Sequence, residues 1–324
     1  MFEASQLVFY YAISPVHMGA GSAIGAIDSP IQREVHTQHP MFAGSGLKGA
    51  LRHHFNRDWE RTTDNKPNLL INRIFGPDTS ASDFAGALSL SDAQLVALPV
   101  RSLKGSFAYV TSPLALARLH RLAIQAGLPI EWNVPNVAEN KAATASDALL
   151  QAKGSEKQLV LEAFEFIKDD VVGINSIAEW ISKYALPDAS YQFFADKLKS
   201  DLVVLNDTDF AHFARHAMVI EPHVRINDES GTADDGGLFY VENLPPETLM
   251  VGLAQASIER YKKNSRSAES SALLNAPEIL SCVFSGQGRQ APGIAGKLLQ
   301  IGGDATTGRG LVLVQSVSSS QKGS

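Results

Sequence analysis

Apolar residues along the chain fall into short continuous runs and into helical stripes, which together predict a protein of mixed helices and strands. The run at 6–14 is rich in β-branched and aromatic residues and predicts a buried strand. Leu47, Leu51 and Phe55 recur at every fourth position. This spacing predicts a helix over 45–59 with one apolar face.

The rest of the pattern predicts further strands and helices in an irregular order. Strands are predicted at 86–91, 94–102, 106–111, 158–167 and 248–256, and on both sides of a glycine loop near the C-terminus. Helices are predicted at 113–126, 175–186, 190–199, 207–217 and 277–284. We see no internal repeat and no obvious linker, and 324 residues suit one elaborated domain or two ordinary ones.

A long hairpin arm is predicted at 219–243. Residues 219–226 and 237–243 have the composition of two strands, and the glycine-bearing segment 227–236 between them is polar. Such a tip is too polar for a core, so we expect the arm to reach out from the domain.

A long loop separates the first strand from the first helix, and it ends at a candidate anion site. A loop of this length without regular structure is usually functional or disordered, and the apolar residues spread through it argue against disorder. In Gly44–Gly49, backbone amides, the Ser45 hydroxyl and the Lys48 ammonium come together at a helix start, where Ser45 can act as N-cap. Phosphate is the usual ligand of such an arrangement.

Composition and charge narrow the function classes. The net charge is −6 and the pI is near 5.8, which argues against a protein that coats duplex DNA by global charge. No apolar run of membrane-spanning length and no basic signal-peptide start is present, so a cytoplasmic location is expected. The single cysteine, Cys282, excludes a disulfide and a cysteine metal site within the chain.

Two glycine motifs do not fit the common nucleotide-binding patterns. Gly19 and Gly21 follow an apolar strand, but a dinucleotide-binding turn must open a helix, and Pro30 disfavours helix at Ser29. The stretch Gly44–Gly49 is no Walker A motif, because no serine or threonine follows Lys48.

Asp28 and three histidines are further candidates for chemistry. Asp28 is either a turn residue before Ser29-Pro30 or a group that binds magnesium or shapes charge at a phosphate, since an ordinary aspartate is a poor base at pH 7. His17 lies beside glycines at a strand end. We expect it equally to face a ligand or to pack within the protein. His53 and His54 are consecutive in a helix and point apart, so they make a poor shared metal site.

The stretch Gly302–Gly310 holds four glycines and two threonines between apolar strands. Such a composition lets a backbone lie close against a ligand, and the simpler alternative is a glycine-rich β-turn.

Together these stretches resemble the RAMP superfamily of CRISPR effector proteins. The matching motifs are HxGxG from His17, Asp28-x-Pro30-Ile31-x-Arg33, Gly44-Ser45-x-Leu47-Lys48-Gly49 and the terminal GGDATTGRG. They are most similar to the fourth subunit, the backbone, of type III-B (Cmr) complexes. One departure is Met41-Phe42-Ala43, where the family usually has Ile-Pro before the glycine.

The resemblance implies a single α+β domain over 1–324, a modified RRM-like (ferredoxin-like) fold. It also implies insertions at about 62–84 and 128–218, a thumb hairpin at about 219–243 and a glycine loop at 302–310. Copies would stack head to tail along a CRISPR guide RNA, together with other Cmr-complex subunits and no membrane, and each copy would cut the guide-paired target RNA once.

The resemblance further implies roles for individual residues. Asp28 would be the cleavage residue and a ligand of Mg²⁺ or Mn²⁺. The residues expected to bind RNA are His17, Gly19, Gly21, Arg33, Ser45, Gly46, Lys48, Arg52, Arg225, Gly303, Thr306, Thr307 and Arg309. Two alternatives stay open: a non-catalytic RNA-binding scaffold, and an endoribonuclease of the same superfamily that processes the guide precursor.

Overall fold

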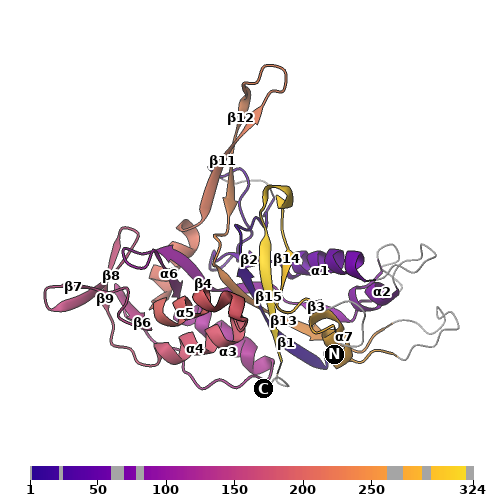
Figure 1. Cartoon of the computed structure of the whole chain (residues 1–324), viewed down its shortest axis with the longest axis horizontal. Coiled ribbons are helices and arrows are strands. Elements are labelled where there is room, and N and C mark those ends of the chain that lie inside the picture. The colour runs from indigo at the N-terminus through magenta and orange to yellow at the C-terminus, as the bar shows by residue number, and fades with distance from the viewer. Residues whose placement is uncertain are drawn as a thin grey trace.

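The centre of the fold is an antiparallel sheet whose middle strands lie in the order β15 (Leu311–Val317), β1 (Ala4–Ala12), β13 (Leu249–Ala256), β4 (Ala93–Arg101) (Figure 1). Helix α1 (Gly44–Asp58) connects β1 to β4, and α7 (Ala276–Phe284) lies between β13 and β15. This strand order and connectivity are those of a ferredoxin-like domain, so the predicted α+β fold class is confirmed. The computed structural model describes residues 2–21, 25–59, 69–77, 84–260, 273–286 and 293–318.

Strand β1 is buried on both faces, which explains its continuous apolar run. Val8 and Tyr10 face a core formed with α1 and α7. Leu7 and Phe9 face a second core, which is covered by α3 (Pro113–Gln125) and α4 (Ile174–Ala185). The sheet is therefore the middle layer of three.

Helix α1 forms as predicted, but its N-terminus is satisfied in another way. Leu47, Leu51 and Phe55 are fully buried. The N-cap is Ala43 rather than Ser45, because the Asp92 carboxylate accepts from the Gly44 N–H at 2.8 Å. A carboxylate of the protein thus occupies part of the helix start that the sequence assigned to phosphate.

The middle of the chain extends this sheet beyond β4. The added strands, in spatial order, are β5 (Phe107–Thr111), β10 (Leu202–Leu205), β6 (Lys141–Thr144), β9 (Phe164–Lys168), β8 (Glu156–Leu161) and β7 (Gln151–Lys153). The prediction of one strand over 158–167 is wrong, because the chain reverses near Glu162, which adopts a φ of 51°. The buried strand β10 is four residues long and was not predicted.

The remaining elements are short or flank the sheet. They are β2 (Met41–Phe42), α2 (Leu69–Phe75), β3 (Leu88–Leu90), α5 (Gln192–Asp201), α6 (Asp207–His216) and β14 (Lys297–Gln300), with 3-10 turns at Ala189–Tyr191 and Ala305–Thr307. Much of the predicted insertion at 62–84 lies outside the described residues, and α2 falls within it. Within the described ranges, no helix has the length and apolar character needed to span a membrane.

The predicted arm is present and projects away from the body of the domain (Figure 1). It consists of β11 (Val219–Ile226) and β12 (Ala233–Asn243), paired antiparallel as a separate two-stranded sheet.

We expect Leu51→Ala to lower the free energy of unfolding by about 2–5 kcal/mol, because Leu51 is fully buried between α1 and the sheet. The matched change on the exposed side of the same helix is Gly49→Ala, where an added Cβ meets nothing within 4 Å. That change should stabilise by roughly 1 kcal/mol through helix propensity. Urea unfolding of both variants measures the difference, and equal effects would contradict the assigned faces.

Candidate functional site

The motifs from the two ends of the sequence meet at His17. The Gly303 N–H donates to the His17 carbonyl at 2.8 Å, and the His17 Nδ1 lies 2.7 Å from the carbonyl oxygen of Glu242 at the root of the arm. Gly302 has a φ of 74°, and a Cβ there would lie 2.2 Å from the His17 oxygen. The N-terminal loop, the C-terminal glycine loop and the arm root therefore form one continuous site.

Glu242 ties the long N-terminal loop to the arm, and the sequence analysis missed it. Its side chain is almost fully buried, and its carboxylate accepts from the Ile31 N–H at 3.0 Å and from Arg33 at 2.5 Å. Its own N–H donates to the Ser29 carbonyl at 3.0 Å. An acid at the inner end of a predicted strand was the available signal, but its partners are about 210 residues away in sequence.

Asp28 is exposed and is held against the arm. Its Oδ2 accepts from the Tyr240 N–H at 2.8 Å, and the neighbouring Ser29 N–H donates to the Tyr240 carbonyl at 3.1 Å. The loop that carries Asp28 is thus fixed in register with β12, and the exposed Asp28 lies beside the arm.

The surroundings of Asp28 fit a metal ion shared with a substrate rather than a closed protein site. In the described part of the chain, no three His, Cys, Asp or Glu side chains converge in a way that could hold a metal. Mg²⁺ is commonly bound through one or two carboxylates and the phosphates of a substrate, with water completing the shell. An exposed Asp28 beside RNA phosphate would provide such a donor set.

Arg33 is occupied within the protein. Its guanidinium is 15% exposed and donates to Glu242, to the Gln38 carbonyl at 2.7 Å and to the Ala214 carbonyl at 2.8 Å. A weaker bond reaches the Arg215 carbonyl at 3.3 Å, so Arg33 covers carbonyls in the last turn of α6. This geometry gives Arg33 a structural role, and its contact with RNA stays a prediction.

Lys48 and Arg52 also have partners inside the protein. The Lys48 ammonium donates to the Leu88 carbonyl at 2.9 Å, and burial, followed by the nearby Arg52, lowers the pKa of Lys48. Arg52 donates to Asn72 Oδ1 at 3.0 Å and to the Gly76 carbonyl. Lys48 thereby holds α1 to β3, and Arg52 holds α1 to α2. The contact of both side chains with guide RNA stays a prediction.

The helix start and the N-terminal glycines are more open. Ser45 and Gly46 are exposed in the first turn of α1, and a Cβ on Gly46 would lie 3.2 Å from Met18 Cε. Gly19 and Gly21 are exposed in the loop. These four residues leave accessible backbone near His17.

The glycine loop is bound to the arm through Arg309. This guanidinium reaches both oxygens of Glu221 in β11 at 2.7 Å. Thr306 and Thr307 are exposed in the 3-10 turn, and the Thr307 hydroxyl donates to the Asp304 carbonyl at 2.8 Å. The loop therefore contains a 3-10 turn with two exposed threonines and is tied to the arm by Arg309.

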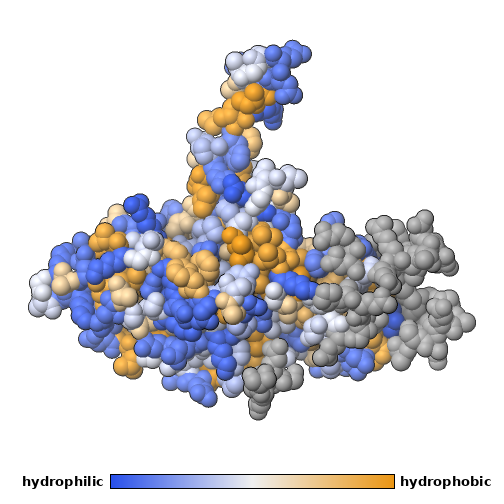
Figure 2. All heavy atoms as spheres, viewed as in Figure 1, coloured by the Kyte–Doolittle hydropathy of each residue, from blue (hydrophilic) through white to orange (hydrophobic). Residues whose placement is uncertain are grey.

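One face of the arm is apolar and exposed. In the β11–β12 register, Pro222 pairs with Tyr240 and Val224 pairs with Leu238, and paired side chains share a face. Val224 is 47% and Leu238 53% exposed, and apolar side chains follow the shaft of the arm in Figure 2. The sequence analysis recognised the polar tip but not this apolar shaft.

The opposite face of the arm carries polar and aromatic groups. Glu221, His223 and Arg225 alternate along β11 on this side, and the His223 ring stacks on Phe239 with centroids 5.3 Å apart. Arg225 is exposed, as a residue that contacts RNA must be. The arm is therefore amphipathic across its thickness.

Comparison with known proteins places these features in a family. The model of the RAMP superfamily matches residues 9–313. The chain belongs to the RAMP superfamily. The CRISPR system Cmr endoribonuclease Cmr4 of Pyrococcus furiosus is 36% identical to this RAMP chain over 312 residues, covering 95% of the chain and 94% of the relative.

Solved structures agree with this membership. Oligomeric Cmr4 from Pyrococcus furiosus superposes with a TM-score of 0.66 at 28% identity, covering 96% of this chain and 97% of that one. A chain of the type III-B Cmr-beta complex bound to cognate target RNA has a TM-score of 0.65 at 19% identity, covering 97% and 98% of the two chains. At 19% identity, the similarity to the Cmr-beta chain is a similarity of fold alone.

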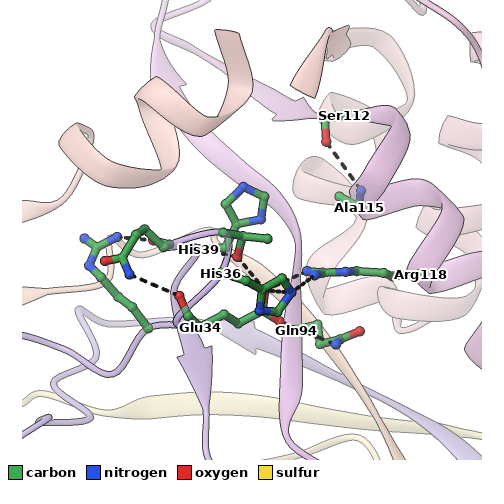
Figure 3. Close-up of polar contacts among 10 residues, drawn as sticks. Glu34, His36, His39, Gln94, Ser112, Ala115 and Arg118 are labelled. Atoms are coloured by element: carbon green, nitrogen blue, oxygen red, sulfur yellow. Dashed lines mark hydrogen bonds and ion pairs between the residues drawn. The ribbon is translucent and has the colours of Figure 1, made fainter. Parts of the chain in front are cut away.

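A buried ion pair supports the far end of the Asp28 loop in this RAMP domain (Figure 3). The Glu34 carboxylate accepts from Arg118 of α3 at 2.8 Å and from the Thr37 hydroxyl at 2.6 Å. Arg118 also lies 3.0 Å from His36 Nε2. Burial acts to raise the pKa of Glu34, but the hydrogen bonds from Thr37 and Arg118 outweigh it, and the pKa is lowered.

We expect Arg118→Leu to destabilise the protein by about 3–5 kcal/mol, because it leaves the Glu34 charge buried without its partner. The double variant Glu34→Leu/Arg118→Leu should recover most of this loss, since an apolar pair of similar volume needs no charge compensation. Urea unfolding at pH 7 measures both. A double variant as unstable as Arg118→Leu would contradict the ion-pair explanation.

The Glu34–Arg118 pair also makes the stability of the fold depend on pH. The folded-state pKa of Glu34 lies below its unfolded value, so its ionised form stabilises the fold at neutral pH, and this stability is lost as the pH falls through the folded-state pKa. The double variant should lose this part of the acid sensitivity.

Proposed function

We propose that the chain is a guide-RNA-binding backbone subunit of a type III-B effector complex and an endoribonuclease that cuts the target RNA paired to that guide. The observation that carries the proposal is the position of Asp28, which is exposed and bonded to Tyr240 of the arm, two residues before the Glu242 that contacts His17. The 36% identical relative named as a Cmr endoribonuclease supports the activity.

The chemistry needs little from the protein beyond positioning. RNA supplies its own nucleophile: the 2′-hydroxyl gives its proton to water as its oxygen attacks the adjacent phosphorus, and the bond to the 5′-oxygen breaks. The departing 5′-oxygen takes up a proton from water, which leaves a 2′,3′-cyclic phosphate and a 5′-hydroxyl. The reaction requires the attacking and leaving oxygens to be in line. Asp28 would orient the 2′-hydroxyl or hold Mg²⁺ or Mn²⁺, and the bound ion would supply positive charge at the phosphate.

The arm would create the in-line geometry. A regular duplex keeps the 2′-oxygen out of line with the leaving oxygen, so a segment that distorts the duplex beside Asp28 promotes cleavage. The Asp28 carboxylate and the Tyr240 N–H of β12 are bonded directly, so the acid and the arm keep a fixed relation. One arm per copy gives one cut per copy.

Guide binding would be independent of sequence. Exposed backbone and hydroxyls at Ser45, Gly46, Thr306 and Thr307 can contact phosphates and sugars, which position RNA without reading bases. Base pairing with the guide then supplies target specificity. Copies would associate head to tail, a heterologous contact that builds a stack along the guide with other Cmr subunits.

The proposal predicts that Asp28→Asn abolishes target cleavage in the assembled complex while guide binding, target binding and unfolding midpoint stay unchanged. The exposed carboxylate contributes one bond to the fold and carries the cleavage step. Gel analysis of labelled target with Mg²⁺, with EDTA, and with Mg²⁺ restored is the measurement. Asp235→Asn, a change of an exposed acid near the arm tip, is the matched control and should cleave normally.

Normal cleavage by Asp28→Asn would remove Asp28 from the mechanism and favour a non-catalytic RNA-binding scaffold. Cleavage of guide precursor by the isolated chain, insensitive to EDTA, would favour the processing endoribonuclease.

The two faces of the arm should respond differently to substitution. Val224→Ser/Leu238→Ser changes the exposed apolar face, and we expect target cleavage to fall while guide binding is retained, because the apolar face distorts the duplex rather than contacting guide phosphates. Arg225→Ser changes the polar face, and it should weaken RNA binding and reduce the slope of log K against log salt by about 1.

Salt titrations of guide binding and single-turnover cleavage assays measure the two effects. Equal losses of binding and cleavage in both variants would show that the arm is only a binding element.

A further inference from the structure

Two histidines lie side by side at the root of the arm. His212 and His216 are one turn apart in α6, both are exposed, and their ring centroids are 4.7 Å apart with planes inclined by 43°. Side chains four residues apart share one helix face, which is the spacing that lets two imidazoles reach one ion. The consecutive pair His53 and His54 lacks this arrangement.

The surroundings keep the pair in place and leave it accessible. The Phe164 ring, from the start of β9, packs against the His212 ring in a T-shaped arrangement with centroids 4.8 Å apart. Within the described residues, neither imidazole has a hydrogen bond or an ion pair. Arg215 adjoins His216 in sequence, and the Asp209 carboxylate, one turn before His212, is engaged by the Asn140 N–H and the Asn206 side chain. The affinity for a cation must therefore come from the imidazoles themselves.

We propose that His212 and His216 together bind one divalent transition-metal ion of the Zn²⁺, Ni²⁺ or Cu²⁺ class. Neutral imidazole nitrogens suit these ions, whereas Mg²⁺ prefers oxygen ligands such as Asp28. Two protein ligands leave further coordination positions for water or for a group of an adjoining molecule. This site is distinct from the cleavage site in both ligand type and metal class.

The position of the pair gives the ion a structural consequence. Helix α6 ends at His216, and the first strand of the arm begins at Val219. An ion bridging the last two turns stabilises the helix end from which the arm emerges, and it stabilises the folded chain by mass action.

The test is titration of the tag-free, full-length chain with ZnCl₂ in an isothermal calorimeter, without RNA or partners. We expect one saturable equivalent per chain and a rise of the thermal midpoint with Zn²⁺. His212→Ala/His216→Ala should abolish that equivalent and the thermal shift. Each single variant should bind Zn²⁺ at least about tenfold more weakly than the native chain, because the loss of a group that merely supports a ligand already costs roughly that much.

The matched control is His53→Ala/His54→Ala, which removes the same number of imidazoles from another helix and should bind Zn²⁺ as the native chain does. Circular dichroism without metal verifies that the variants fold. The proposal is overturned if the native chain shows no saturable binding, or if the His212→Ala/His216→Ala variant binds with unchanged stoichiometry and affinity.

The Zn²⁺-binding test and the cleavage test of the proposed function can fail independently of each other. Target cleavage restored by Mg²⁺ alone in the His212→Ala/His216→Ala complex is expected, because Asp28 is untouched. Failure of the Asp28 experiment would leave the Zn²⁺ result standing, and failure of Zn²⁺ binding would leave cleavage unaffected.

Discussion

The buried carboxylate of Glu242 is the contact on which the site depends. A carboxylate removed from water is costly unless charges and hydrogen bonds compensate it, and here Arg33 and the Ile31 N–H do so. Because Glu242 lies near the end of the arm strand while its partners lie in the N-terminal loop, this compensation holds only when loop and arm are docked. The same stretch of β12 holds Asp28 through Tyr240, so folding of the arm root and placement of the acid are one event.

The ferredoxin-like centre explains why this docking can be rigid. Strand β1 is buried on both faces and is flanked by β13 and β15, so the ends of these strands are fixed relative to one another. The loop after β1, the glycine loop before β15 and the arm before β13 all leave the sheet near its central strand. Loops held by such a scaffold are where binding and catalytic groups are generally placed.

Local patterns predicted much of this, and long-range pairing accounts for what they missed. Leu47, Leu51 and Phe55 encode α1 within a few turns, and the strand composition of the arm around a polar tip is equally local. For Glu242 the local sign was only an acid at the inner end of a predicted strand, because its partners come from the other end of the chain. Ser45 was predicted to be the N-cap of α1. Instead, the Gly44 N–H at the helix start donates to the carboxylate of Asp92, which lies 48 residues away in sequence.

Several cationic side chains near the site are already bonded within the protein, and this bears on how the proposed RNA ligand could be bound. Arg33 and Arg309 both end on acids of the arm, Glu242 and Glu221, so both guanidinium charges are already paired within the protein. Lys48 and Arg52 are likewise bonded to groups of α2 and β3. Of the residues expected to bind RNA, those that the structure leaves exposed offer backbone amides, hydroxyls and the Arg225 guanidinium. Such groups follow the sugar–phosphate backbone irrespective of bases, as the proposed binding of guide RNA requires.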